Sequence, residues 1–158
     1  MSKRRQVRER VLQALYAQEV SQDAADHVMA TLIRPVYEDE PTYLRFAERL
    51  FLRSLDVRET AEELIARHIQ NWEIGRLALT DRLVLRMAVA ELIYFEDIPP
   101  KVTLNEALEV AKVFSTEKSG AFVNGVLDAI LTEMRERDLL NKSGRGLVEV
   151  STNSSTTS

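Results

Sequence analysis

Apolar residues recur every three or four positions along almost the whole chain, and this spacing constrains the fold more than any other feature. It is the period of one face of an α-helix, and no stretch shows the strict alternation of a half-buried strand. Only five Gly and four Pro occur in 158 residues, so long segments run without a helix breaker. The pattern therefore predicts an all-α protein of about seven helices.

Prolines and capping residues set the expected helix boundaries. Pro35 ends a helix, Pro41 starts one, and Pro99-Pro100 closes another. Asp56, Thr80 and the pair Thr103 with Glu106 are the expected N-terminal caps. The expected helices cover residues 3–19, 23–34, 41–51, 56–71, 80–95, 103–114 and 115–134. We expect one helical domain over residues 1–141 and a disordered Ser/Thr-rich tail over residues 142–158, because the tail has too little apolar surface to fold.

The helix expected after Thr80 is apolar nearly all round, which requires other helices to surround it. Arg86 and Glu91 interrupt it, and we expect them to form a buried charged group bonded to neighbouring helices. His68 lies on an apolar stripe and is expected to be a core histidine with a hydrogen bond.

The charge is unevenly distributed along the chain. The net charge is −4 and the isoelectric point is near 5.3, which argues against a general nucleic-acid coat protein. The first 20 residues nevertheless carry a net charge of +3. Their basic residues are Lys3, Arg4, Arg5, Arg8 and Arg10, and their acidic residues are Glu9 and Glu19. A basic arm on an acidic body indicates local contact with a polyanion.

Three arginines are the strongest chemical signal in this arm. On a helix, Arg4, Arg5 and Arg8 should share one face, roughly opposite the Val7 and Val11 stripe. Guanidinium groups bind phosphate oxygens with two parallel hydrogen bonds, so this face suits RNA. The alternative is a solvated, basic terminus. If the face binds RNA, changing all three arginines to alanine should weaken RNA binding and leave thermal stability nearly unchanged.

Aromatic and polar residues elsewhere extend this hypothesis. Tyr16 lies off the apolar stripe, where it could stack on a base or pack as a half-buried side chain. Lys118 and Ser119 lie at an expected helix start, which can bind anions. Phe122 is turned away from the Val123 stripe, and it could support a base or fill a gap between helices.

The same residues exclude most enzyme classes. The chain has no cysteine, so thiolate metal sites and Cys nucleophiles are excluded, and no Gly-rich phosphate loop or Ser/His/Asp set occurs. Neither His27 nor His68 has a glutamate three residues before it, so neither forms the Glu-x-x-His element of a di-iron bundle. We therefore expect no catalytic activity, no metal and no cofactor. With no run of about 18 apolar residues and no signal peptide, we expect a cytoplasmic protein that does not bind membranes.

Several motifs in register resemble the NusB family of bacterial transcription antitermination factors. They are Arg4-Arg5-x-x-Arg8-Glu9, Gln13-Ala-Leu-Tyr16, Asp81-Arg-Leu-Val-Leu-Arg86-x-Ala-x-x-Glu91-Leu92, Asn105-Glu-Ala-x-Glu-x-Ala-Lys112 and Lys118-Ser-x-x-Phe122-Val-Asn-Gly-Val-Leu-Asp128. The resemblance covers about residues 3–134. It is weak from residue 21 to residue 71.

The resemblance implies two packed three-helix bundles and a protein that is not an enzyme. It implies binding of boxA, a short single-stranded U-rich RNA, together with the ribosomal protein NusE, as part of the antitermination complex on RNA polymerase. RNA-binding positions carried over by matching are Lys3, Arg4, Arg5, Arg8, Tyr16, Lys118, Ser119 and Phe122, and Asp81 matches a position that meets NusE. Lys118 departs from the acidic residue of some members, and it should strengthen RNA binding nonspecifically.

Two other readings of the sequence remain open at this point. One is a free-standing RNA-binding domain like that at the N-terminus of ribosomal RNA cytosine methyltransferases. The other is a helical interaction module without an RNA ligand, in which the arginines are merely solvated.

Overall fold

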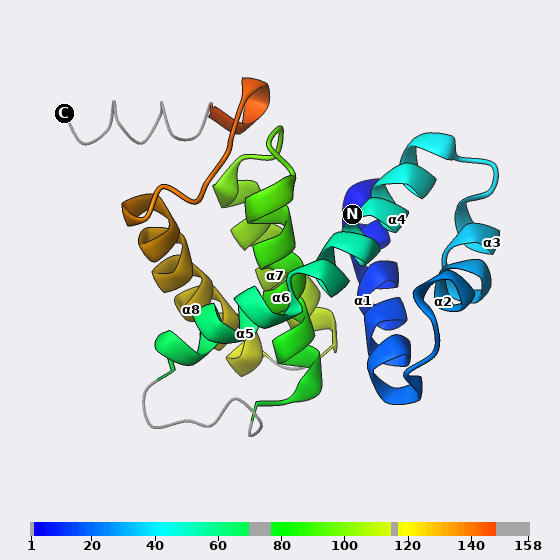
Figure 1. Cartoon of the computed structure of the whole chain (residues 1–158), viewed down its shortest axis with the longest axis horizontal. Coiled ribbons are helices and arrows are strands. Elements are labelled where there is room, and N and C mark those ends of the chain that lie inside the picture. Colours follow the sequence, from blue (N-terminus) through cyan, green and yellow to red (C-terminus); the bar gives the residue numbers. More distant parts are fainter. Residues whose placement is uncertain (1, 70–76, 115–116, 148–158) are drawn as a thin grey trace.

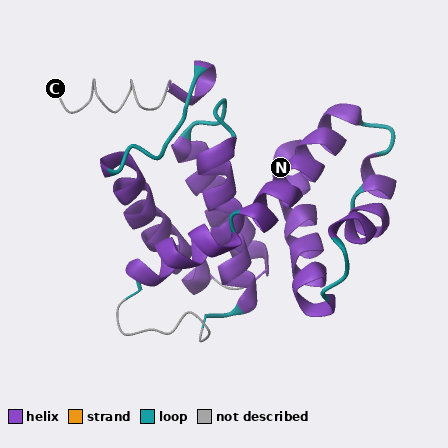
Figure 2. Ribbon diagram, in the orientation of Figure 1, coloured by secondary structure: helices purple, strands orange, loops and turns teal. Residues whose placement is uncertain are grey.

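The computed structural model describes residues 2–69, 77–114 and 117–147, which form eight α-helices and one short 3₁₀ helix without a strand (Figures 1 and 2). In chain order the elements are α1 (Lys3–Ser21), α2 (Ala25–Leu32), α3 (Arg34–Tyr37), α4 (Pro41–Asp56), α5 (Arg58–Arg67), α6 (Leu79–Tyr94), α7 (Pro100–Phe114), α8 (Glu117–Glu136) and η2 (Gly144–Leu147). The all-helical prediction is confirmed. The expected helix end at residue 71, the expected start at residues 115–116 and the tail from residue 148 lie outside the described residues.

The helices pack in two groups that share one hydrophobic core. Helices α1 to α4 form one group, and α5 to α8 form the other (Figure 1). Helix α6 contacts α1 and α4 of the first group as well as α5, α7 and α8 of its own. It is buried over almost its whole length, as its apolar surface predicts.

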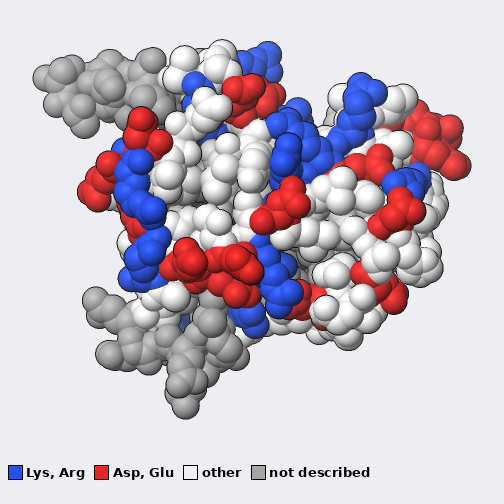
Figure 3. Space-filling model, viewed as in Figure 1, with Lys and Arg blue, Asp and Glu red and all other residues white. Residues whose placement is uncertain are grey.

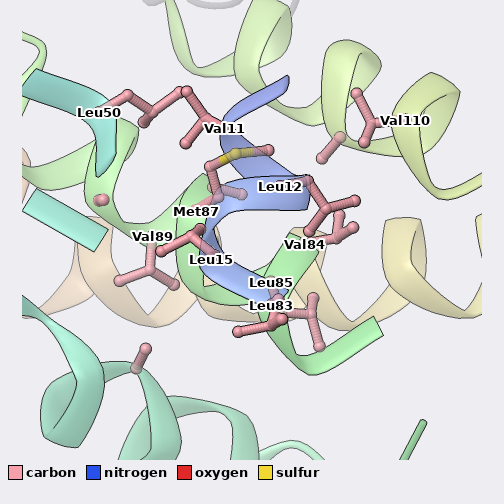
Figure 4. Close-up of a cluster of buried hydrophobic side chains, with 14 of the residues drawn as sticks. Val11, Leu12, Leu15, Leu50, Leu83, Val84, Leu85, Met87, Val89 and Val110 are labelled. Atoms are coloured by element: carbon pink, nitrogen blue, oxygen red, sulfur yellow. The ribbon is translucent and has the colours of Figure 1, made fainter. Parts of the chain in front are cut away.

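The junction of the two groups is formed by α1 and α4 of the first group packing against α6 of the second. Val11, Leu12 and Leu15 of α1 are at most 2% exposed and lie beside Met87 and Val84 of α6 (Figure 4). Leu50 of α4 and Val110 of α7 flank them on the two sides. Since α1 packs against four other helices, the side chains along its remaining face have well-defined positions.

Several expected helix boundaries and caps differ from the structure. Thr80 lies in the first turn of α6, whose N-cap is Ala78. Pro35 lies in the first turn of α3, and Pro100 begins α7, because proline suits the first turn of a helix as well as the end of the preceding one. Thr103 and Glu106 therefore lie inside α7 and form no capping box. Asp56 is the last residue of α4 and pairs with Arg53, instead of capping α5.

The folded chain continues past the predicted domain boundary at residue 141. Lys142 donates from Nζ to the backbone carbonyls of Glu91 and Phe95, at 3.2 and 2.8 Å, and so caps the end of α6. The amide of Ser143 donates to the carbonyl of Glu96 at 2.9 Å. Residues 142–147 thus belong with the helical domain, because lysine at a helix end satisfies its free carbonyls.

An ion cluster joins α5 to α8. Glu133 accepts hydrogen bonds from Arg67 at 3.1 Å, from Nε2 of His68 at 2.7 Å and from Arg137 at 2.7 Å. These bonds, first that from Arg67, lower the pKa of Glu133 from 4.5 to about 2. The expected hydrogen bond of His68 is confirmed, but the expected core position is wrong, because His68 follows the end of α5 and its side chain is 23% exposed.

This depressed pKa predicts an acid-dependent loss of stability. A carboxylate with a lowered pKa stabilises the folded state above its unfolded pKa, and the contribution disappears as the pH falls to the folded pKa. The free energy of unfolding of the wild type should exceed that of Glu133→Gln at pH 7, and the difference should shrink between pH 4.5 and about 2. Urea unfolding of both proteins across this pH range measures the difference in free energy of unfolding. A difference that does not change with pH would contradict the prediction.

Candidate nucleic-acid interface

The N-terminal end of α1 presents cations above aromatic rings. The side chain of Ser2 caps the helix by accepting a hydrogen bond from the amide of Arg5 at 3.1 Å. The Lys3 ammonium lies 5.7 Å from the ring centre of Tyr43 and 3.2 Å from Glu40. Arg4 is exposed, and its guanidinium lies 4.6 Å from the ring centre of Phe46. Stacking holds the flat guanidinium while its N–H edge stays free to bind an anion.

Arg5 is held by a carboxylate but remains accessible. Its Nε and Nη2 atoms donate to Glu106 of α7, at 3.0 and 2.7 Å, while 30% of the side chain stays exposed. The hydrogen bonds that Arg5 donates to Glu106 are the main reason that the pKa of the Arg5 guanidinium is raised. Arg5 can therefore bind a phosphate at the outer edge of an ion pair that fixes its position.

Arg8 lies inside the protein, so the expectation that it shares an exposed face with Arg4 and Arg5 is wrong. Its side chain is 3% exposed and donates two hydrogen bonds to Glu91 of α6, at 2.6 and 2.9 Å. Glu106 lies 3.6 Å away, and the Thr103 hydroxyl donates to Glu91 at 3.0 Å. Burial alone would lower the pKa of Arg8, but the two carboxylates, Glu91 and then Glu106, outweigh burial and raise it. Arg8 fastens α1 to α6 and α7.

These side chains surround an open hollow of about 600 Å³. It lies where the first turns of α1, α4 and α7 meet. Its lining residues are Ser2, Lys3, Arg4, Arg8, Thr42, Tyr43, Val102 and Glu106. A hollow lined by the cations Lys3 and Arg4 and by the ring of Tyr43 suits a phosphate with its adjoining base.

A second, smaller hollow lies beside the middle of the same helix, near the start of α6 and the end of α7. Tyr16 is 47% exposed, as expected from its place off the apolar stripe. The hollow has a volume of about 350 Å³ and is lined by Leu12, Gln13, Tyr16, Thr80 and Phe114. The sequence did not predict Phe114, Gln13 and Thr80 as binding residues, because this hollow is assembled from three different helices.

The remaining predicted positions lie at the first turns of α6 and α8. Asp81 is 7% exposed and accepts a hydrogen bond from the Ser119 hydroxyl at 3.2 Å, which joins the two helices. Lys118 is exposed. Phe122 is partly buried and packs against the core, so only part of its ring is available to a ligand. The role of Asp81 as a contact for a partner protein stays a prediction.

The other cations on the face seen in Figure 3 are mostly tied to neighbours. Blue side chains gather over α4, while red ones gather along α5 and near the loop that connects α3 to α4. Arg49 stacks 4.2 Å from the ring centre of Phe95 and donates to the carbonyl of Tyr94. Arg53 stacks 4.4 Å from the ring centre of Tyr94 and pairs with Asp56. Lys3, Arg4 and Arg5 also have neighbours, but they gather at the start of one helix, where Lys3 and Arg4 line the hollow of about 600 Å³, and this makes them the better candidates for binding a polyanion.

The buried charge on α6 forms a second ion network. Arg86 lies 3.7 Å from Glu19 of α1 and 4.0 Å from Glu62 of α5. Burial lowers the pKa of Arg86. Together with the pair of Arg8 and Glu91, this network confirms that both charges on the apolar helix are buried and bonded to other helices.

The described residues contain neither a cluster of metal ligands nor a membrane-spanning helix. Within residues 2–69, 77–114 and 117–147, no three His, Asp or Glu side chains gather as a metal site would require. In the same part of the chain, none of the helices combines the length and the apolar character needed to cross a membrane.

Comparison with known proteins assigns the family. The sequence model of the NusB family matches residues 5–132. Transcription antitermination protein NusB of Salinibacter ruber is 47% identical over 152 residues, which cover 96% of this chain and 95% of that protein. The NusB protein of Chloroherpeton thalassium is 42% identical over 150 residues, or 93% of this chain and 70% of its own length. These relatives are named as antitermination proteins and not as enzymes.

Solved structures agree with this assignment. T. maritima NusB superposes with a TM-score of 0.76 at 34% identity, covering 84% of this chain and 93% of that one. NusB in a complex of antitermination factors NusB and NusE with dsRNA superposes with a TM-score of 0.70 at 26% identity, covering 84% and 99%. The chain therefore belongs to the NusB family of transcription antitermination proteins.

Proposed function

We propose that this protein is a cytoplasmic transcription antitermination factor that binds a single-stranded, U-rich boxA-like RNA together with NusE. In this role it would join the antitermination complex on RNA polymerase as an adaptor without catalytic activity. RNA would lie along the seam between α1 and α7, with its phosphates near Lys3, Arg4 and Arg5.

The observation that carries this proposal is that the seam between α1 and α7 has cations of α1 at one place and aromatic rings of both helices farther along. Arg5 bonds Glu106 of α7 at the first place, and Tyr16 lines a hollow with Phe114 of α7 at the second. The two places lie about 16 Å apart, at 1.5 Å per residue of α1. An extended strand of a few nucleotides could contact both places at once.

Exposed rings favour unpaired RNA over a duplex. Aromatic side chains contribute about 1–3 kcal/mol for each stacked base, but only when the base is free to leave its neighbours. Duplex RNA offers phosphates without accessible base faces. The related NusB was solved together with NusE and double-stranded RNA, so a duplex is the necessary comparison.

A titration followed by fluorescence anisotropy tests the proposal. The probes are a labelled U-rich single strand, a scrambled single strand and a duplex, each with and without NusE. We expect the U-rich strand to bind most tightly and NusE to increase its affinity. Preference for the duplex, or equal affinity for all three probes, would contradict the proposal.

A further inference from the structure

We propose that the hollow beside Tyr16 holds a single uracil base, and that Gln13 selects uracil over cytosine through its side-chain amide. This inference rests on the proposed function and adds a specificity-determining residue to it. The hollow lies on the same seam as the cations, so a strand bound at Arg5 can reach it.

The shape and lining of the hollow suit one base. Tyr16 and Phe114 supply aromatic rings, and Leu12 contributes an apolar side chain that is 2% exposed. The volume of about 350 Å³ lies at the lower end of the range of small-molecule sites, about 300–1,000 Å³. Polar groups are few, so those present decide which base edge is accepted.

Arg10 fixes which way the Gln13 amide faces. Its Nη1 donates to the Gln13 side chain at 3.2 Å, while its Nε donates to the backbone carbonyl of Leu32 at 2.7 Å. A guanidinium has donors and no acceptor, so the atom of Gln13 that faces it must be the oxygen. The amide NH₂ then points away from Arg10, and it has no acceptor among the described residues.

A fixed NH₂ group discriminates between the two pyrimidines. Uracil carries a carbonyl oxygen at position 4, which accepts a hydrogen bond, whereas cytosine carries an amino group there, which donates one. The amide NH₂ of Gln13 can donate a hydrogen bond to the uracil oxygen. It cannot bond the cytosine amino group, because both groups are donors. The hydroxyl of Thr80 can donate or accept, so it bonds either base and does not discriminate.

The test compares RNA strands in which each uridine is replaced singly by cytidine. One position should show an about tenfold loss of affinity with the wild-type protein, the size expected when one hydrogen bond becomes a clash of donors. In Gln13→Glu, one carboxylate oxygen still accepts from Arg10 while the other can accept from cytosine. The loss at that position should therefore disappear or become a gain.

Two further variants separate this effect from simpler ones. Gln6→Glu makes the same change of charge on an exposed position of α1 and should keep the tenfold loss. Arg10→Met frees the Gln13 amide to rotate, and it should abolish discrimination at the same position without reversing it. Thermal unfolding confirms that each variant is folded.

The outcomes distinguish the inference from the function on which it rests. If Gln13→Glu and Gln6→Glu discriminate equally, the inference is wrong while RNA binding stands. If the wild type binds no U-rich strand, the proposed function fails, and the inference fails with it.

Discussion

Replacing Arg8 with alanine should destabilise the fold by about 3–5 kcal/mol, the cost of leaving a buried charge without its partner. The change would strand Glu91, which is 2% exposed and, within the described part of the chain, keeps only the hydroxyl of Thr103 as a side-chain donor. For a domain of this size, the melting temperature should fall by on the order of 10 °C. Urea unfolding and calorimetry of the purified protein measure the two quantities.

Two matched variants control this prediction. Arg4→Ala removes an exposed arginine from the same helix and should change stability by less than about 1 kcal/mol. The double change Arg8→Met and Glu91→Leu replaces the pair with apolar side chains, and it should recover much of the loss. Equal stability of Arg8→Ala and Arg4→Ala would show that the buried pair does not hold α1 in place.

The burial of Arg8 changes the expectation drawn from the sequence for the three arginines. The sequence predicted that changing Arg4, Arg5 and Arg8 together would spare thermal stability. Since Arg8 is buried, the triple variant should lose stability as well, and its RNA binding could not be interpreted. A test of the RNA-binding role must therefore leave Arg8 in place.

The double change Arg4→Gln and Arg5→Gln should weaken binding to U-rich RNA by about 10- to 100-fold at moderate salt, because two phosphate contacts are lost. Glutamine at position 5 can still donate a hydrogen bond to Glu106, and Arg8 remains 3.6 Å from this carboxylate. The fold should therefore persist. Anisotropy titration with the U-rich strand gives the ratio of affinities.

A second double variant separates site from net charge. Arg135→Gln and Arg145→Gln remove two exposed cations from α8 and η2. Their removal should weaken RNA binding by less than about threefold, through the general field alone. If both double variants weaken binding equally, the basic end of α1 has no special role.

The sequence predicted the fold well because its signals are local. Apolar spacing is decided within one helix, and the nearly uniform apolar surface of α6 indicated its central position correctly. The predicted helix boundaries were less reliable where one residue can either end a helix or start the next. Pro100 can end one helix or start the next, and the observed start at Pro100 moved Thr103 and Glu106 from a cap into the body of α7.

The candidate site was predicted only in part, because side-chain partners come from distant segments. The spacing of α1 gives the angular position of Arg8 but not what covers it, and its partner Glu91 is 83 residues away. Tyr16 could be placed at the surface from its angle alone. The contribution of Phe114 beside it depends on how α7 packs, which no pattern within α1 contains.

The salt dependence of RNA affinity tests the central claim most directly, namely that exposed cations at the start of α1 bind phosphates while Arg8 only holds the helix. With Lys3, Arg4 and Arg5 each contacting one phosphate, the plot of log affinity against log salt should have a slope of about −2 for a single strand. The slope should fall to about −0.7 in the Arg4→Gln and Arg5→Gln variant. Equal slopes for the two proteins would contradict the claim.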